Sequence, residues 1–87
     1  MAAGVTDKDA RTQILNKFYE IYRQQGLHFI VNEDQVADDL GLDRIQVKRC
    51  FDYLAAKGLM RRMTRGGGFS PTVELIDAVE DEGAQSS

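Results

Sequence analysis

Apolar residues recur three and four positions apart near the start of the chain and predict a helix over about 7–24. The stripe consists of Ala10, Ile14, Leu15, Phe18, Ile21 and Tyr22. This spacing places them on one buried face. Thr6 or Asp7 suits the beginning of the helix, and Gly26 suits its end because glycine accepts the left-handed backbone conformation. The next residues, 27–31, are β-prone and predict one short strand or an extended link.

Two further helices are predicted on either side of a turn at Gly41. Asn32 opens the first and Asp43 opens the second, and each is followed three residues later by a glutamine, as a capping box requires. Apolar positions mark the buried sides of both helices: Val36, Ala37, Leu40, Val47, Cys50, Phe51 and Leu54. Gly58 ends the second of these helices, which is expected to span 43–57.

The segment 59–70 predicts a small β-hairpin. Residues 59–64 would form its first strand, the Arg-Gly-Gly-Gly stretch at 65–68 a flexible turn, and Phe69 and Ser70 a short return strand.

A last helix is predicted to begin where Ser70 precedes Pro71, because proline favours the first helical position. Its apolar positions run to about residue 80. Residues 1–6 and the acidic residues 81–87 are expected to be disordered. The sequence therefore predicts one α+β, mainly α domain with a three-helix core, a small hairpin and a C-terminal helix.

Length and composition favour a single domain with one core. The chain has 87 residues, of which 43% are hydrophobic. No apolar run approaches the ~18 residues of a membrane span, and the first residues do not resemble a secretion signal. The single cysteine is typical of a reducing compartment. We therefore expect a cytoplasmic protein, nucleoid-associated if its source is prokaryotic, with no membrane partner.

Positive charge is concentrated in one part of this acidic chain. The net charge is −3, yet residues 44–65 hold seven Lys or Arg and a single acid, Asp52. The remaining residues hold four basic and thirteen acidic side chains. A basic helix followed by a basic hairpin is typical of a small DNA-binding module.

The pattern at 36–60 resembles that of the winged-helix repressor families. It reads apolar-Ala-x-x-Leu-Gly-apolar, then a cap, a valine four residues on, and an apolar ladder that ends in Leu and Lys-Gly-Leu-Met. The matching positions are Val36, Ala37, Leu40, Gly41, Leu42, Asp43, Val47, Phe51, Leu54, Lys57, Gly58, Leu59 and Met60. The resemblance covers roughly 10–79 and implies a winged helix-turn-helix fold. It also implies that the helix 43–57 lies in the DNA major groove and that the wing, 59–70, lies along the backbone.

The resemblance and the glycine-rich wing give a set of expected DNA contacts. These are Arg44, Ile45, Gln46, Lys48, Arg49, Arg61, Arg62, Arg65 and Gly67. Arginine can hold guanine through two hydrogen bonds, while the alternative for Lys48 and Arg49 is a solvated helix face on which Lys48 pairs with Asp52. Only one of Arg61 and Arg62 can face DNA, because adjacent strand residues point to opposite faces.

Four residues keep more than one interpretation. Ile45 is expected to point outward, where it would meet a thymine methyl group or anchor a protein interface. Gln46 would face adenine, but its role in the capping box already explains it, so the structural interpretation is preferred. Asp52 would read a cytosine, orient Arg49, or indicate that the helix does not enter DNA. Tyr19 belongs either to the core or to a dimer interface.

We therefore expect sequence-specific binding of double-stranded DNA by a small transcriptional regulator, which would act as a homodimer formed through the first or the last helix. The alternative is a protein-interaction winged helix that acts as an adaptor or subunit. A weaker option is binding of single-stranded nucleic acid or RNA. The expected lack of exposed aromatic residues on the basic face argues against this option, because such binding uses aromatic rings for base stacking. We expect no enzyme activity, cofactor, metal or small-molecule ligand, because the chain has one His, one Cys and no nucleophile–base spacing. Cys50 is expected to be a small core residue.

Overall fold

The computed structural model describes residues 5–63 and 68–86, and side chains up to residue 81. Within these residues the chain forms a small α+β, mainly helical domain with four helices and a two-stranded antiparallel hairpin. In chain order the elements are α1 (Asp7–Gln25), α2 (Glu33–Leu40), α3 (Arg44–Ala56), β1 (Met60–Arg62), β2 (Phe69–Pro71) and α4 (Val73–Ser86).

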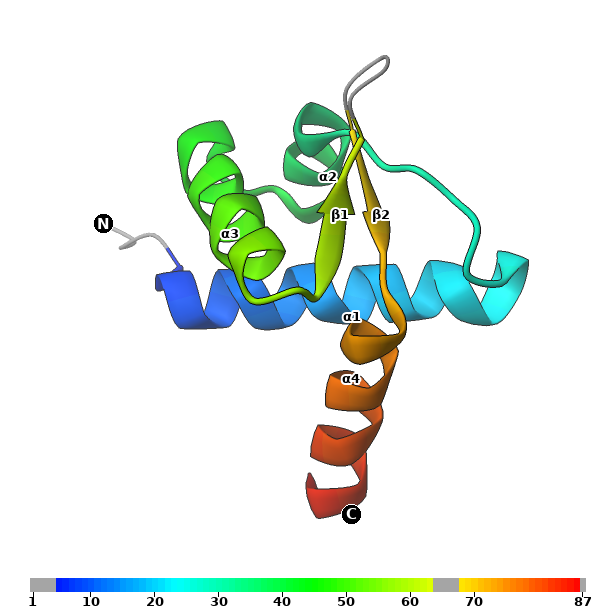
Figure 1. The fold of residues 1–87 in the computed structure, drawn as a ribbon. Helices are drawn as coiled ribbons and strands as arrows, with labels where there is room; N and C mark the ends of the chain where they lie inside the picture. The colour runs from blue at the N-terminus through cyan, green and yellow to red at the C-terminus, as the bar shows by residue number, and fades with distance from the viewer. Residues whose placement is uncertain (1–4, 64–67, 87) are drawn as a thin grey trace.

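The long helix α1 is the base on which the other elements are arranged (Figure 1). Helices α2 and α3 and the hairpin lie on one side of α1, and α3 covers its N-terminal half. Helix α4 packs on the other side, and its C-terminal half projects away from the body of the domain.

A row of three buried phenylalanines joins α1, α3 and the hairpin. The ring of Phe51 in α3 meets Phe18 of α1 edge-on at a centroid distance of 5.8 Å, and meets Phe69 of β2 edge-on at 4.7 Å. Edge-to-face pairs of this kind add about 0.5–1.5 kcal/mol each beyond the area they bury. The rest of the core surrounds this row: Ala10, Ile14, Val36, Ala37, Val47, Cys50, Leu54, Met60, Leu75 and Ile76.

The predicted helix boundaries are confirmed at the starts of α1, α2 and α3. The side chains of Thr6, Asn32 and Asp43 each accept a backbone N–H from the first turn. Gly41 adopts the left-handed conformation with φ of 68° and turns the chain between α2 and α3. Gly26 ends α1 with a φ of 89° but a ψ of −167°, so it does not adopt the left-handed helical conformation expected of it.

The two capping boxes are only half formed in the described part of the chain. The Gln35 amide donates to Asp39 Oδ1 at 3.0 Å rather than closing the box at Asn32. Gln46 also turns away from its cap and contacts the start of α1. The sequence pattern therefore located the helix starts correctly, but it assigned both glutamines the wrong partner.

The β-prone residues 27–31 form an extended link with a single bridge to the hairpin. Val31 and Phe69 exchange two backbone hydrogen bonds, of 2.8 and 2.7 Å. The link therefore runs beside β2, so that the hairpin lies between α3 and the link (Figure 1).

The prediction for the start of the last helix was wrong. Pro71 is the final residue of β2 and pairs with Met60, which is compatible with proline because the strands of a two-stranded sheet are both edges. The cap is instead Thr72, whose hydroxyl accepts the Leu75 backbone N–H at 3.4 Å. Helix α4 then continues to Ser86, past the expected end near residue 80 and into residues predicted to be disordered. This segment contains no proline to stop the helix.

Two glycines with the same backbone angle provide a matched test of how the link is packed on the hairpin. Gly68 has a φ of 90°, and a Cβ built there would lie 2.7 Å from Ile30 Cγ2 and 2.9 Å from the Val31 carbonyl oxygen. Gly26 has a φ of 89° and nothing within 4 Å of such a Cβ. We expect Gly68→Ala to lower the free energy of unfolding by about 1–3 kcal/mol more than Gly26→Ala. Urea unfolding followed by circular dichroism measures both, and equal losses would contradict this packing.

Candidate nucleic-acid interface

Helix α3 buries one side in the core and presents the other to solvent. Val47, Cys50, Phe51 and Leu54 are buried. The exposed side carries Arg44, Ile45, Lys48, Arg49, Asp52 and Tyr53. Tyr53 is 43% exposed, so the expectation that the basic face lacks exposed aromatics was wrong. The prediction that Ile45 points outward is confirmed, because 70% of this residue is exposed.

One edge of this exposed side is tied to the first turn of α1 through Asp7. Arg49 donates from Nε to Asp7 Oδ2 at 3.1 Å and from Nη2 to Asp7 Oδ1 at 2.8 Å. Gln46 donates from Nε2 to the same Oδ1 at 3.2 Å and also to the Val5 carbonyl oxygen. The carboxylate of Asp7 thus joins two of the residues that the sequence singled out as DNA contacts.

This arrangement strongly favours the ionised carboxylate. The hydrogen bond from Arg49, followed by that from Gln46, lowers the pKa of Asp7 from 3.8 to about 2. The same contact raises the pKa of Arg49. Both groups therefore remain charged at any pH at which the protein would work.

Sequence reasoning missed Asp7 as part of this site. It was considered only as a helix cap, whereas Thr6 is the cap. The contact with Arg49 spans 42 positions along the chain, so no short-range rule points to it. The one available signal was an acidic residue in the first turn of a helix, and helix-dipole effects alone explain such a residue.

The opposite edge of α3 is tied to the hairpin by Asp52. Its Oδ1 lies 2.5 Å from Nη2 of Arg62 in β1. The guanidinium of Arg62 also lies over the Phe69 ring, 4.8 Å from the centroid. Asp52 therefore does not orient Arg49, which was one of the roles considered for it. The alternative pairing of Lys48 with Asp52 is not found among the described residues.

The two adjacent arginines of β1 lie on different surfaces, as predicted from the alternation of side chains along a strand. Arg62 faces α3 through Asp52. Arg61 instead lines a hollow of about 470 Å³ together with side chains of the 27–31 link and with Met63 and Ser70. Arg62 is therefore the arginine on the α3 side of the hairpin. The other two wing candidates, Arg65 and Gly67, lie outside the described residues.

The remaining basic side chains of α3 are only loosely held. Arg44 lies 3.9 Å from Asp38, and about two thirds of each side chain is exposed. Lys48 makes no ion pair within residues 5–63 and 68–81, and its side chain is exposed.

Tyr19 and Cys50 have structural roles inside the chain. The Tyr19 hydroxyl donates to Glu80 Oε2 at 3.0 Å and joins α1 to α4, while its ring packs against the core. Cys50 is buried as predicted, and burial raises the pKa of its thiol.

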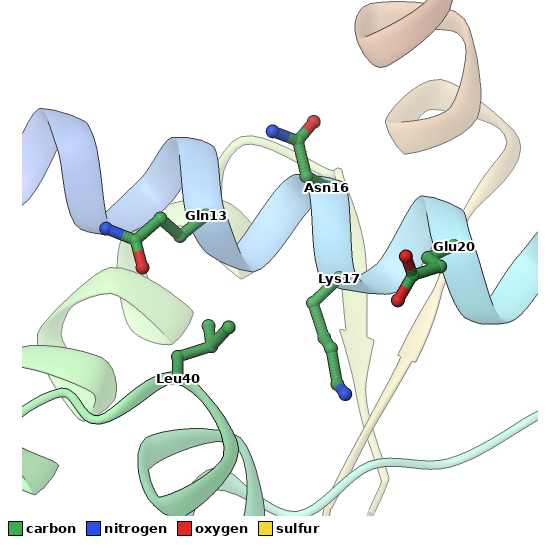
Figure 2. A pocket seen from close by; sticks show the side chains of 5 residues that line it. All are labelled: Gln13, Asn16, Lys17, Glu20 and Leu40. Atoms are coloured by element: carbon green, nitrogen blue, oxygen red, sulfur yellow. The ribbon is translucent and has the colours of Figure 1, made fainter.

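A polar hollow of about 320 Å³ lies between α1 and the end of α2 (Figure 2). It is lined by Gln13, Asn16, Lys17, Glu20 and Leu40. Figure 2 shows Asn16 pointing away from Leu40, and the Lys17 amine lies 3.5 Å from Asp39. The hollow is therefore lined mainly by side chains of α1, and few of its polar groups point to a common position where a ligand could bind.

Among the described residues, no cluster of three or more His, Cys, Asp or Glu side chains could hold a metal ion. No helix in the same part of the chain is both long and apolar enough to cross a membrane.

The sequence matches no known protein-family model and no curated protein. A functional proposal therefore rests on the geometry of α3, the hairpin and the start of α1.

The Asp7–Arg49 contact makes a prediction about stability and pH. The folded-state pKa of Asp7, about 2, lies below its ordinary value of 3.8, so the contact stabilises the fold fully above 3.8 and loses this effect as pH falls through about 2. We expect Asp7→Asn to lower the melting temperature at neutral pH, and the difference from wild type to shrink below pH 3.8 and disappear as pH falls through about 2. The control is Asp9→Asn, which removes the same charge from the same turn. A melting-temperature difference that stays constant over this pH range would contradict the assignment.

Proposed function

We propose that the chain is a winged helix-turn-helix domain that binds double-stranded DNA sequence-specifically as a small transcriptional regulator. In this proposal α2, the Gly41 turn and α3 form the helix-turn-helix. Helix α3 lies in the major groove, and the hairpin forms a wing over the DNA backbone. The order of elements and the position of the hairpin beside α3 support this interpretation.

The observation that carries the proposal is the solvent side of α3. Arg44, Ile45 and Lys48 near its N-terminal end are exposed and are not used for packing in the core. Base-reading helices contact DNA from their N-terminal residues. An exposed isoleucine between basic residues has no folding role, and contact with a thymine methyl group would give it one.

The overall negative charge is compatible with this function. At physiological salt, the field of an exposed charge decays over ~8 Å. Helix α4, which carries several of the acidic residues, packs on the other side of α1 from α3 (Figure 1). A phosphate backbone placed against α3 would therefore be little affected by the charge of α4.

A homodimer fits the size of the module. One small domain makes few phosphate contacts, and two copies would read half-sites about one helical turn apart. Helix α4 supports this arrangement better than α1, because α4 projects from the body while α1 is covered on both sides (Figure 1).

A protein-docking function is the second candidate, and Ile45 favours it. Exposed aliphatic and aromatic side chains are frequent interface anchors, and α3 exposes Tyr53 as well as Ile45. Such a complex would persist at high salt and would depend on Ile45 more than on Lys48.

Salt-dependent DNA binding by matched charge variants tests the proposal. We expect Lys48→Ala to weaken binding of labelled random duplex several-fold, and to make the slope of log affinity against log salt concentration less negative by about 1. Fluorescence anisotropy measures both quantities. The control is Arg23→Ala, which removes an exposed cation at the far end of α1 from α3. The absence of wild-type binding at low salt would reject the proposal and favour protein docking.

A further inference from the structure

The guanidinium of Arg49 is held along one edge only. Its Nε and Nη2 atoms each donate one hydrogen to the Asp7 carboxylate. A guanidinium has five N–H donors, so both hydrogens on Nη1 and one on Nη2 remain. These point away from Asp7 along the end of the side chain, and 59% of the Arg49 side chain is exposed.

The unused end of Arg49 has the geometry that guanine requires. Guanine presents O6 and N7 as two acceptors in the major groove, and arginine binds them through two parallel N–H groups. The contact with Asp7 therefore does not block base recognition. It fixes the direction in which the donors of Arg49 point.

Asp7 is itself fixed in place by the start of α1. Thr6 caps the helix immediately before it. Gln46 donates to both the Asp7 carboxylate and the Val5 carbonyl, which joins α3 to this segment at a second point. Because Asp7 is fixed in this way, it orders the Arg49 side chain before DNA binds. Less conformational entropy is then lost on binding.

The same contacts change what Gln46 can do. Recognition of adenine needs one amide hydrogen and the amide oxygen of glutamine together. The amide nitrogen of Gln46 has two hydrogens, and its two acceptors are Val5 and Asp7. Gln46 is thus left with only its oxygen and cannot form the adenine pair while these contacts persist.

We propose that Asp7 is a positioning residue for base recognition. It presents the free end of Arg49 to one guanine in the DNA major groove, and together with Val5 it withdraws Gln46 from adenine recognition. This inference rests on the proposed DNA binding by α3. It extends the DNA-reading unit from α3 to residues 5–7, which lie before and at the start of α1.

Selection from randomised duplexes tests the role of Asp7 directly. Wild type, Arg49→Ala, Asp7→Asn and the charge control Asp9→Asn would each be used to enrich a duplex pool, and the enriched sites would be sequenced. We expect the wild-type site to contain one guanine that is preferred about tenfold over adenine. This preference should disappear with Arg49→Ala, fall to about threefold or less with Asp7→Asn, and persist with Asp9→Asn. Preferences at the other positions should be unchanged.

The outcomes separate failure of this inference from failure of the proposed function. If Asp7→Asn retains the guanine preference and binds all duplexes more tightly, Asp7 merely shields Arg49 and the inference is wrong while DNA binding stands. If wild type enriches no sequence and binds no duplex, the proposed function itself is wrong. Melting curves of each variant, recorded by circular dichroism, establish that the binding temperature lies in the folded range. A loss of fold alone would weaken binding at every position and would not remove one guanine preference.

Discussion

The packing of Phe51 between Phe18 and Phe69 is the constraint on which the rest of the structure depends. These rings are the points at which α3 meets both α1 and the hairpin. A domain of this size is stabilised by about 4–13 kcal/mol in total, and removal of one buried phenylalanine ring costs about 3–5 kcal/mol. The same row of rings fixes the rotation of α3 about its axis. Because Phe51 and its buried neighbours in α3 face the core, Ile45 lies on the opposite side of the helix and is exposed.

Once α3 is fixed in this way, its polar edges find partners on both neighbouring elements. Arg49 reaches the first turn of α1, and Asp52 reaches Arg62 in β1. Each pair is largely exposed, so its contribution to stability is modest. Its consequence for the surface is larger, because each pair holds a long arginine side chain in one orientation. The aromatic core positions the helix, and the ion pairs position its side chains.

The sequence was sufficient to predict features that depend on neighbours along the chain. The helix starts at Thr6, Asn32 and Asp43, the turn at Gly41 and the outward position of Ile45 all follow from local pattern, and the structure agrees with each. The winged-helix interpretation and its DNA contacts remain proposals.

Features that depend on tertiary contacts could not be predicted from local pattern. Asp52 lies only three residues after Arg49, yet Arg49 pairs with Asp7, which lies 42 residues earlier in the chain. Asp52 in turn pairs with Arg62, because α3 and β1 pack together. Pro71 likewise lies in strand β2, where it pairs with Met60, although its local propensity favours the start of a helix.

Fewer of the basic residues concentrated in the second half of the sequence are available to bind DNA phosphates than their number suggests. Arg61 lines the hollow beside the 27–31 link, while Arg49 and Arg62 each lie beside a carboxylate. In α3 this leaves Arg44 and Lys48 as the basic side chains most available to phosphates. Non-specific affinity depends on the number of phosphates neutralised, so one copy of this domain would hold random DNA weakly. A domain of this kind would therefore depend on oriented base contacts, and on the contacts of a second copy, for most of its affinity at a specific site.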